Sequence, residues 1–503
     1  MRESSILTAS ALVAVAAAQG YTGAPIVSSD ELVKLVTIDE LVAGSQDLYD
    51  IAMSNDGQRA FGEGGHNATV DYIYNALQET GYYDVYKQPF VELYRGFNIG
   101  FTAAGTKYKA AYMHYAPQGN LTEPLIMVPN FGCNSTDYPS AVTGNIAFIQ
   151  RGNCYSSDKV ANAKGAGAVG VVISNRIEDD DIMGGTLNSP IEWIPTVLIE
   201  YVTGQRIFAQ LASGPVDAHI SIKFIQENRT TFNVIAETKD GDHDNVFSLG
   251  GHTDSAPGGP GINDNGSGTI GLLTVAKHLA RFTVTNAVRF GFWSAEEYGL
   301  LGSDHYVKTL NGTISGNASE IAKVRAYVNF DMIASPNYRL GVHDGDGSTF
   351  NFSGPPGSGI IEKNFGAFFK AKNLPFVSSE FNGRSDYAAF LENGIAAGGV
   401  DTGAEGLKTA EEQQLFGGQA GVAYDVSYHG PDDTMDNLAR DAFLWNVQAM
   451  ADAVGTYAVD FGDIPKADAG SAVQTGMEKR MWMRKFEGVR EEMCRERRGF
   501  KLE

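Results

Sequence analysis

Residues 246–282 read VFSLGGHTDSAPGGPGINDNGSGTIGLLTVAKHLARF, and the pattern of this stretch indicates the fold class of the protein. An apolar run over 246–249 predicts a short buried strand, and the apolar spacing over 269–282 predicts a helix. The Gly- and Pro-rich segment between them predicts a loop that carries His252, Asp254 and Asp264. A strand, a loop and a helix in that order form the repeating unit of a mainly parallel α/β sheet.

The same alternation continues along the chain. Strands are predicted over 287–293, 326–330 and 395–400, and helices over 360–371 and 437–457. Ligands of such sheets gather outside the carboxyl ends of the strands. We therefore expect an α/β fold with a mixed, mainly parallel sheet flanked by helices, and a functional site at the carboxyl ends of its strands.

Acidic residues and histidines occur where these strands end. Glu296 and Glu297 follow the strand 287–293, and Asp331 follows the strand 326–330. Two adjacent carboxylates are costly to hold together unless a positive charge lies between them. Imidazole and carboxylate groups are also ligands that zinc accepts. The sequence therefore predicts a metal centre whose ligands are His252, Asp264, one of the pair Glu296 and Glu297, Asp331 and His429.

Asp254 is expected to support this centre. It lies two residues after His252, on the same face of the strand, and is predicted to accept the second ring N–H of that histidine.

The seven histidines other than His252 and His429 lack a matching set of carboxylates, so we expect them at the surface or in packing contacts.

The rest of the chain divides by composition. Residues 27–77 are predicted to be mainly helical, and residues 27–93 are expected to form the N-terminal part of an α/β domain that resumes over 225–460. The segment 94–224 is rich in short apolar runs broken by Gly, Pro and Asn, with a helix near 159–164, and is predicted to be an inserted β-rich domain. Residues 461–503 are expected to form a C-terminal tail, and its charge-rich segment 477–503 is predicted to be a solvated appendage.

Residues 1–20 have the composition of a signal peptide. Arg2 precedes an apolar, Ala-rich run over 6–18, which is shorter than the roughly 20 residues of a membrane span. We therefore expect entry into the secretory pathway, with extracellular or vacuolar residence and no membrane anchor. Eight Asn-x-Ser/Thr sequons agree, although Asn265 falls inside the predicted site; the glycosylation candidates are Asn67, Asn120, Asn134, Asn228, Asn311, Asn317 and Asn351.

Cysteine count and net charge narrow the class of protein. Cys133 and Cys154 flank a short predicted strand and could close a disulfide in an oxidising compartment, which leaves Cys494 over. No CxxC pair is present, so a cysteine-rich zinc module is excluded. The formal net charge of −22 argues against a nucleic-acid partner, because phosphate binding needs clustered Lys and Arg.

These motifs together resemble the co-catalytic dizinc aminopeptidases, the secreted or vacuolar enzymes that include fungal leucine aminopeptidases and aminopeptidase Y. The resemblance covers residues 27–460. It rests on His252-Thr253-Asp254, Asn263-Asp264, Glu296-Glu297, Asn329-Phe330-Asp331, Ser385-Asp386-Tyr387 and Tyr428-His429. Around Cys133 and Cys154, the stretches 150–154 and 163–168 resemble the protease-associated (PA) domain that this subgroup carries as an insertion.

The resemblance implies two Zn²⁺ ions per chain and a role for each ligand. Asp264 would bridge the ions, His252 and Asp331 would complete one site, and Glu297 and His429 would complete the other.

The resemblance also implies catalytic roles. Glu296 would be the general base, Tyr428 a hydrogen-bond donor to the tetrahedral oxyanion, and Arg384 a residue near the substrate. A non-proline cis peptide is implied between Asp264 and Asn265.

The expected activity is release of N-terminal residues, Leu and other apolar ones by family analogy, from peptide substrates by a monomeric enzyme. Two alternatives stay open. One is a carboxypeptidase or a glutaminyl cyclase-type enzyme on the same scaffold. The other is a receptor-like binding protein that has lost catalysis.

Overall fold

The computed structural model describes residues 23–176, 185–187 and 192–466. The expectations for the signal peptide, for the segment 477–503 and for Cys494 fall outside these residues. The described residues divide into two compact units: one lies within residues 93–229, and the other contains residues 23–92 and 230–466. The chain passes between the units within two long strands, β1 (Tyr83–Ala103) and β9 (Asp217–Thr238).

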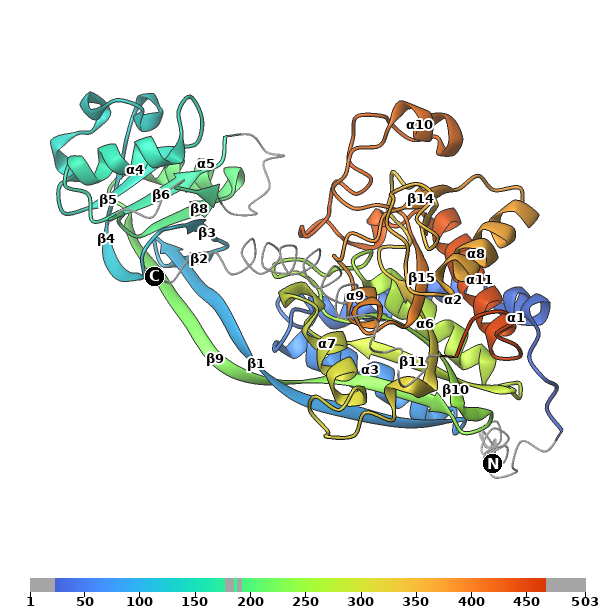
Figure 1. The fold of residues 1–503 in the computed structure, drawn as a ribbon. Helices are drawn as coiled ribbons and strands as arrows, with labels where there is room; N and C mark the ends of the chain where they lie inside the picture. The colour runs from blue at the N-terminus through green and yellow to red at the C-terminus, as the bar shows by residue number, and fades with distance from the viewer. Residues whose placement is uncertain (1–22, 177–184, 188–191, 467–503) are drawn as a thin grey trace, which may run out of the picture. The chain divides into compact units, whose positions relative to one another are not determined.

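The unit that contains all the predicted ligands is built on one sheet (Figure 1). Its strands run in the order β14, β13, β15, β12, β10, β11, β9. In chain order, the six strands other than β9 are β10 (Asp242–His252), β11 (Asn286–Trp293), β12 (Val324–Phe330), β13 (Gly341–His343), β14 (Val377–Ser379) and β15 (Ala396–Asp401). Strand β10 pairs in parallel with β11 and β12, and β12 pairs in parallel with β15, whereas β9 and β13 add antiparallel pairings. The expectation of a mixed, mainly parallel sheet is confirmed.

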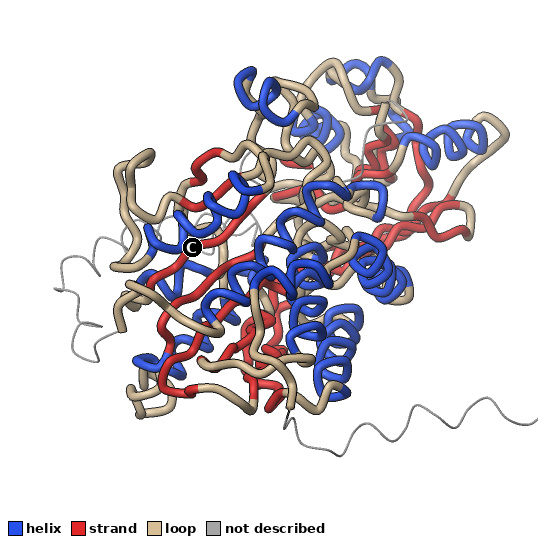
Figure 2. The backbone as a smooth tube through the Cα atoms, turned by 90° about the vertical axis from the view of Figure 1, so that its right-hand side faces the viewer, coloured by secondary structure: helices blue, strands red, loops and turns tan. Residues whose placement is uncertain are grey.

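Helices cover both faces of this sheet, as the tube in Figure 2 shows. The larger apolar core joins one face to α1 (Ser29–Leu35), α2 (Ile38–Met53), α3 (Gly64–Glu79), α6 (Gly266–Leu279), α8 (Ser358–Ala371) and α11 (Arg440–Tyr457). A smaller core contains α7 (Leu301–Leu310) and α9 (Tyr387–Glu392). Side chains alternate between the two cores, as a strand requires: in β12, Val328 joins the larger one and its neighbour Tyr327 the smaller one.

Most predicted elements exist with shifted ends. Helix α6 begins at Gly266, three residues earlier than expected, because the Asn265 side chain caps it by accepting the amide N–H of Gly268. The helices α7, α9 and α10 (Ala410–Phe416) were not predicted, since helices of one to three turns give little periodicity. No helix among the described residues is long and apolar enough to cross a bilayer.

The second unit contains a smaller sheet in the order β4 (Gly119–Met127), β5 (Ile146–Gln150), β6 (Gly170–Ser174), β8 (Thr196–Ile199), β3 (Ala111–His114) and β7 (Gly185–Thr186). The short strand β2 (Thr106–Tyr108) pairs with β1. Helices α4 (Ser156–Gly165) and α5 (Tyr201–Leu211) pack against strands of this sheet. Helix α5 was not predicted. Cys133 and Cys154 form the expected disulfide.

Close packing within the main sheet leaves no room for a side chain at Gly291. Gly291 lies in β11, and a Cβ atom there would stand 2.1 Å from the Trp293 ring. That ring is fully buried, and its Nε1 donates to the Tyr327 hydroxyl over 2.9 Å.

Gly291→Ala should therefore lower the free energy of unfolding by about 1–3 kcal/mol, the usual cost of overpacking a core. Urea unfolding of this variant would be compared with that of Lys277→Ala, which changes an exposed position of α6. Equal midpoints for the two variants would contradict the packing described here.

Candidate metal centre

The five predicted ligands converge at the carboxyl ends of the main sheet's strands. The Nε2 atom of His252, at the end of β10, lies 3.2 Å from Asp264 Oδ1 and 3.3 Å from Asp331 Oδ1. The Nε2 atom of His429 lies 3.1 Å from Asp264 Oδ2 and 3.4 Å from Glu297 Oε2. Segments up to 177 residues apart in the sequence thus meet in one cluster.

Asp264 occupies the middle of this cluster. One carboxylate oxygen faces His252 and the other faces His429, so a single side chain touches both halves of the site. The peptide bond between Asp264 and Asn265 is cis, as the resemblance implied. A carboxylate that offers one oxygen to each side has the geometry required to bridge two cations.

The hydrogen bond of His252 Nδ1 shows which ring nitrogen carries the hydrogen and why the cluster needs positive charge. Its Nδ1 lies 3.0 Å from the main-chain carbonyl oxygen of Asp254, which can only accept, so Nδ1 carries the hydrogen. In a neutral ring Nε2 is then a bare lone pair that faces the carboxylate oxygens of Asp264 and Asp331, which are acceptors too. Either a proton on Nε2 or a metal ion must therefore supply positive charge between these atoms.

Electrostatics lead to the same conclusion. Burial alone would lower the pKa of His252, yet the charges of Asp331 and Glu296 raise it well above its usual range. The site therefore draws positive charge to Nε2, as a proton or as a metal ion. Imidazole nitrogens and carboxylate oxygens suit zinc, so the residues present fit a divalent metal of this kind.

Asp254 acts through a different atom from the one expected. The closest acceptor for His252 Nδ1 is the carbonyl of Asp254, while its carboxylate oxygen Oδ1 is 3.8 Å away. That carboxylate accepts the amide N–H groups of Glu296 at 3.2 Å and Glu297 at 3.3 Å. One residue thus fixes both the imidazole and the paired glutamates.

Glu296 lies beside the cluster. It is buried, and its Oε2 lies 3.9 Å from His252 Nε2, farther than the oxygens of Asp264 and Asp331. Glu296 therefore places a carboxylate beside the site without making any of its four shortest nitrogen–oxygen contacts.

The backbone turns sharply just after β11 and β12 and again in the loop that carries His429. Ala295, Met332 and His429 have positive φ angles of 58°, 49° and 57°. Such angles are uncommon outside glycine and persist where the surrounding structure fixes them, often at functional sites. These turns aim the side chains of the strand ends at one point.

A chain of hydrogen bonds holds Asp331 in place. Asn329 Nδ2 donates to Ser385 Oγ over 2.7 Å, and Ser385 Oγ donates to Asp331 Oδ2 over 2.6 Å. Upstream, the Tyr327 hydroxyl donates to Asn329 Oδ1. Ser385 belongs to the Ser385-Asp386-Tyr387 motif, whose role in positioning Asp331 could not be read from sequence spacing.

A second buried network holds Asp264. Both carboxylate oxygens of Asp433 accept main-chain amides, that of Asn263 over 2.8 Å and that of Asp264 over 2.9 Å. Asn437 Nδ2 donates to Asp433 and also to Asp425. Burial raises the pKa of Asp433 to about 7, with Asp425 adding to the effect.

Tyr428 and Arg384 meet at one side of the site. The Tyr428 ring stacks on the His429 ring with centroids 3.6 Å apart. Arg384 Nη2 donates to the Tyr428 hydroxyl over 3.3 Å, and Arg384 Nη1 pairs with Glu405 at 2.5 Å. Burial raises the pKa of Tyr428 well above its usual range, so the phenol keeps its proton at neutral pH.

His66 is closer to the site than the sequence indicated. Its Nε2 lies 3.0 Å from Thr253 Oγ1, in the segment that follows His252. Burial lowers the pKa of His66 to about 3, so the ring is neutral. No spacing rule links residue 66 to residue 253, which is why this contact was missed.

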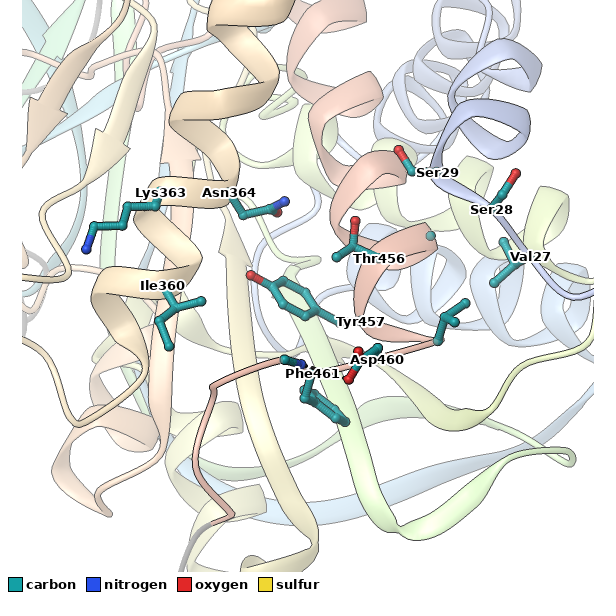
Figure 3. Close-up of a pocket in the computed structure, with 13 residues that line it drawn as sticks. Val27, Ser28, Ser29, Ile360, Lys363, Asn364, Thr456, Tyr457, Asp460 and Phe461 are labelled. Atoms are coloured by element: carbon teal, nitrogen blue, oxygen red, sulfur yellow. Dashed lines mark hydrogen bonds between the residues drawn. The ribbon is translucent and has the colours of Figure 1, made fainter.

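A separate cavity of about 630 Å³ contains none of these groups. It lies where the N-terminal segment, α8 and the end of α11 come together (Figure 3). Ile360, Asn364 and Tyr457 line it, with no pairing of histidine and carboxylate. The cavity therefore does not compete with the cluster as the site of metal chemistry.

Asp254→Asn should weaken metal binding by about tenfold to a hundredfold, as is usual for groups that orient ligands. An asparagine N–H₂ would face the amide of Glu296 or Glu297 instead of accepting from it. Competition with a chelator measures the change. Asp304→Asn, which makes the same chemical change on α7, should bind metal like the wild type, and equal losses in both variants would contradict this role.

Comparison with known proteins agrees with this geometry. Residues 233–454 match the model of peptidase family M28, and residues 121–207 match the PA domain. The probable leucine aminopeptidase 2 of Aspergillus fumigatus is 48% identical over 93% of both chains. A probable leucine aminopeptidase 2 of Aspergillus oryzae is 46% identical over 93% of both.

A solved structure shares the fold. The zinc aminopeptidase BSAP from Bacillus subtilis superposes with a TM-score of 0.55 and 23% identity, covering 84% of this chain and 94% of its own. Nearly half of all residues are shared with the Aspergillus fumigatus relative, across almost the whole length of both proteins. The chain therefore belongs to peptidase family M28.

Proposed function

We propose that this protein is a secreted zinc aminopeptidase that releases N-terminal residues from peptides with two zinc ions per chain. One observation carries the proposal: Asp264 stands between His252 and His429 and offers one oxygen to each. A one-metal centre would not need a carboxylate in that position. The relatives named leucine aminopeptidase support a preference for Leu and other apolar residues.

The ligands would divide between two ions. His252 and Asp331 would hold one, Glu297 and His429 would hold the other, and Asp264 would be shared. When bound, two zinc ions lower the pKa of a water molecule from 15.7 towards about 7 and polarise the scissile carbonyl.

The chain's own residues then move the protons. Glu296 would accept a proton from the attacking water and return it to the departing amine nitrogen. Tyr428 would donate its hydroxyl proton in a hydrogen bond to the oxyanion, and the raised pKa of its phenol keeps that donor available. Arg384 would hold the Tyr428 ring through the contact at 3.3 Å.

The alternatives predict other features. A binding protein without catalysis would have no need of Glu296 beside an intact ligand set. A carboxypeptidase would recognise the other end of the substrate. A glutaminyl cyclase-type enzyme would close an N-terminal Gln without breaking a peptide bond, so the substrate experiment below distinguishes both from an aminopeptidase.

Secretion and domain organisation are part of the same proposal. The sequon asparagines Asn67, Asn120, Asn134, Asn228, Asn317 and Asn351 are exposed and Asn311 is partly exposed, whereas Asn265 is buried and unsuited to glycosylation. A disulfide between Cys133 and Cys154 suits an oxidising compartment. We propose residues 94–224 as an inserted PA domain and a monomer as the working form.

Glu296→Gln should keep two zinc ions per chain while kcat falls by about 10²–10⁴-fold, the usual contribution of a general base. Metal content by mass spectrometry and turnover of Leu-p-nitroanilide measure the two effects. Glu411→Gln, at an exposed position of α10, is the matched control and should change neither. Loss of zinc together with activity would instead make Glu296 a ligand.

The wild-type enzyme should cleave a free-amino Leu peptide and leave its N-acetylated form almost intact. Acetylation removes the basic amine and its charge, which an aminopeptidase must recognise. Product release is followed by chromatography, with a peptide blocked at its carboxyl end by amidation as the control. Equal cleavage of the free and acetylated peptides would exclude the aminopeptidase assignment.

A further inference from the structure

One buried cation near the site has no role in the proposed chemistry. Arg59 lies between α2 and α3 and is fully buried. Its guanidinium donates to three main-chain carbonyls: Nη1 to Thr253 at 2.5 Å, Nε to Pro260 at 2.8 Å and Nη2 to Gly261 at 2.6 Å. All three carbonyls belong to one loop.

That loop joins two of the candidate ligands. It leaves β10 at His252 and leads to Asp264 twelve positions later. The main chain of Arg59 binds the same loop, because its amide donates to Ser255 Oγ over 3.0 Å and its carbonyl accepts the Ser255 amide over 3.2 Å. Both the side chain and the backbone of Arg59 are therefore hydrogen-bonded to this loop.

The guanidinium of Arg59 is buried at an electrostatic cost. Burying a cation against neutral carbonyls is unfavourable, and desolvation lowers the pKa of Arg59 to about 10. The residue still carries its charge at neutral pH. The charges that favour it, in order, are those of Asp254, Asp433 and Asp264, which are the carboxylates of the metal centre and its supports.

We propose that Arg59 is a positioning residue of the metal centre: it fixes the loop 253–261 so that His252 and Asp264 converge. The proposal rests on the metal centre of the proposed function. Arginine suits the task because its planar fork reaches three carbonyls at once, whereas a lysine ammonium is a single point on a flexible stem.

The test compares two buried arginines of the same unit. Arg59→Lys keeps the charge and removes the fork. The control is Arg289→Lys in β11, where the wild-type arginine is also buried but pairs with Glu237 and donates to the Tyr306 hydroxyl. Zinc affinity is measured by chelator competition, and the stability of the metal-free proteins by urea unfolding.

Arg59→Lys should bind zinc about tenfold to a hundredfold more weakly than the wild type, the range found for groups that orient ligands. Its metal-free unfolding midpoint should fall no further than that of Arg289→Lys, which should keep wild-type zinc affinity. Ser255→Ala, which removes one contact between Arg59 and the loop, should shift zinc affinity in the same direction by less.

Unchanged zinc affinity in Arg59→Lys would overturn the proposal, as would equal losses in the two arginine variants. An Arg59→Lys protein that does not fold, beside a folded control, would also overturn it, because Arg59 would then serve the core alone. The zinc content of the wild-type protein is measured first. A wild type without zinc would contradict the proposed function itself, so the two failures are distinguishable.

Discussion

The whole site depends on one electrostatic constraint: carboxylates that are packed around two imidazoles in a buried cluster need positive charge between them. Asp264, Glu297 and Asp331 point oxygens at histidine nitrogens from 3.1 to 3.4 Å away. The Nδ1 hydrogen of His252 is committed to a carbonyl, so its Nε2 cannot satisfy these oxygens while the ring is neutral. Divalent metals resolve the conflict, and the surrounding structure keeps the groups from relaxing apart.

Side chains around the ligands hold them in place through hydrogen bonds. Asp254 fixes His252 and both glutamates, Asp433 fixes the backbone of Asp264, and Ser385 fixes Asp331. Each support is a hydrogen bond from a different part of the fold. Such groups hold metal ligands in their productive orientation and account for much of the affinity of a site. The sheet contributes by ending its parallel strands at one place.

The sequence predicted the main sheet and the converging ligands because both leave local signals. Apolar runs mark β10, β11 and β12, and an acid or a histidine follows each one. The family membership and the mainly parallel sheet are confirmed, while the roles of the individual site residues stay predictions.

What could not be predicted are contacts between segments without a shared pattern. Arg59, His66 and Ser385 reach the site from separate loops and helices. Ser385 belongs to a motif of the resemblance, but its contact with Asp331 has no signal in the local sequence, and neither have the contacts of Arg59 and His66. The acceptor for His252 was likewise assigned to the wrong atom of Asp254, because spacing along a strand cannot distinguish a carboxylate from a carbonyl. The strands β1 and β9, each longer than 20 residues, exceed the usual strand length and were therefore not expected.

The central claim is that two metal ions share Asp264. Crystals grown with zinc, measured on both sides of the zinc absorption edge, test it most directly. The account predicts two anomalous peaks about 3.5–4 Å apart, each within roughly 2.0–2.2 Å of a different Asp264 carboxylate oxygen. A single peak, or two peaks that do not have Asp264 between them, would contradict it.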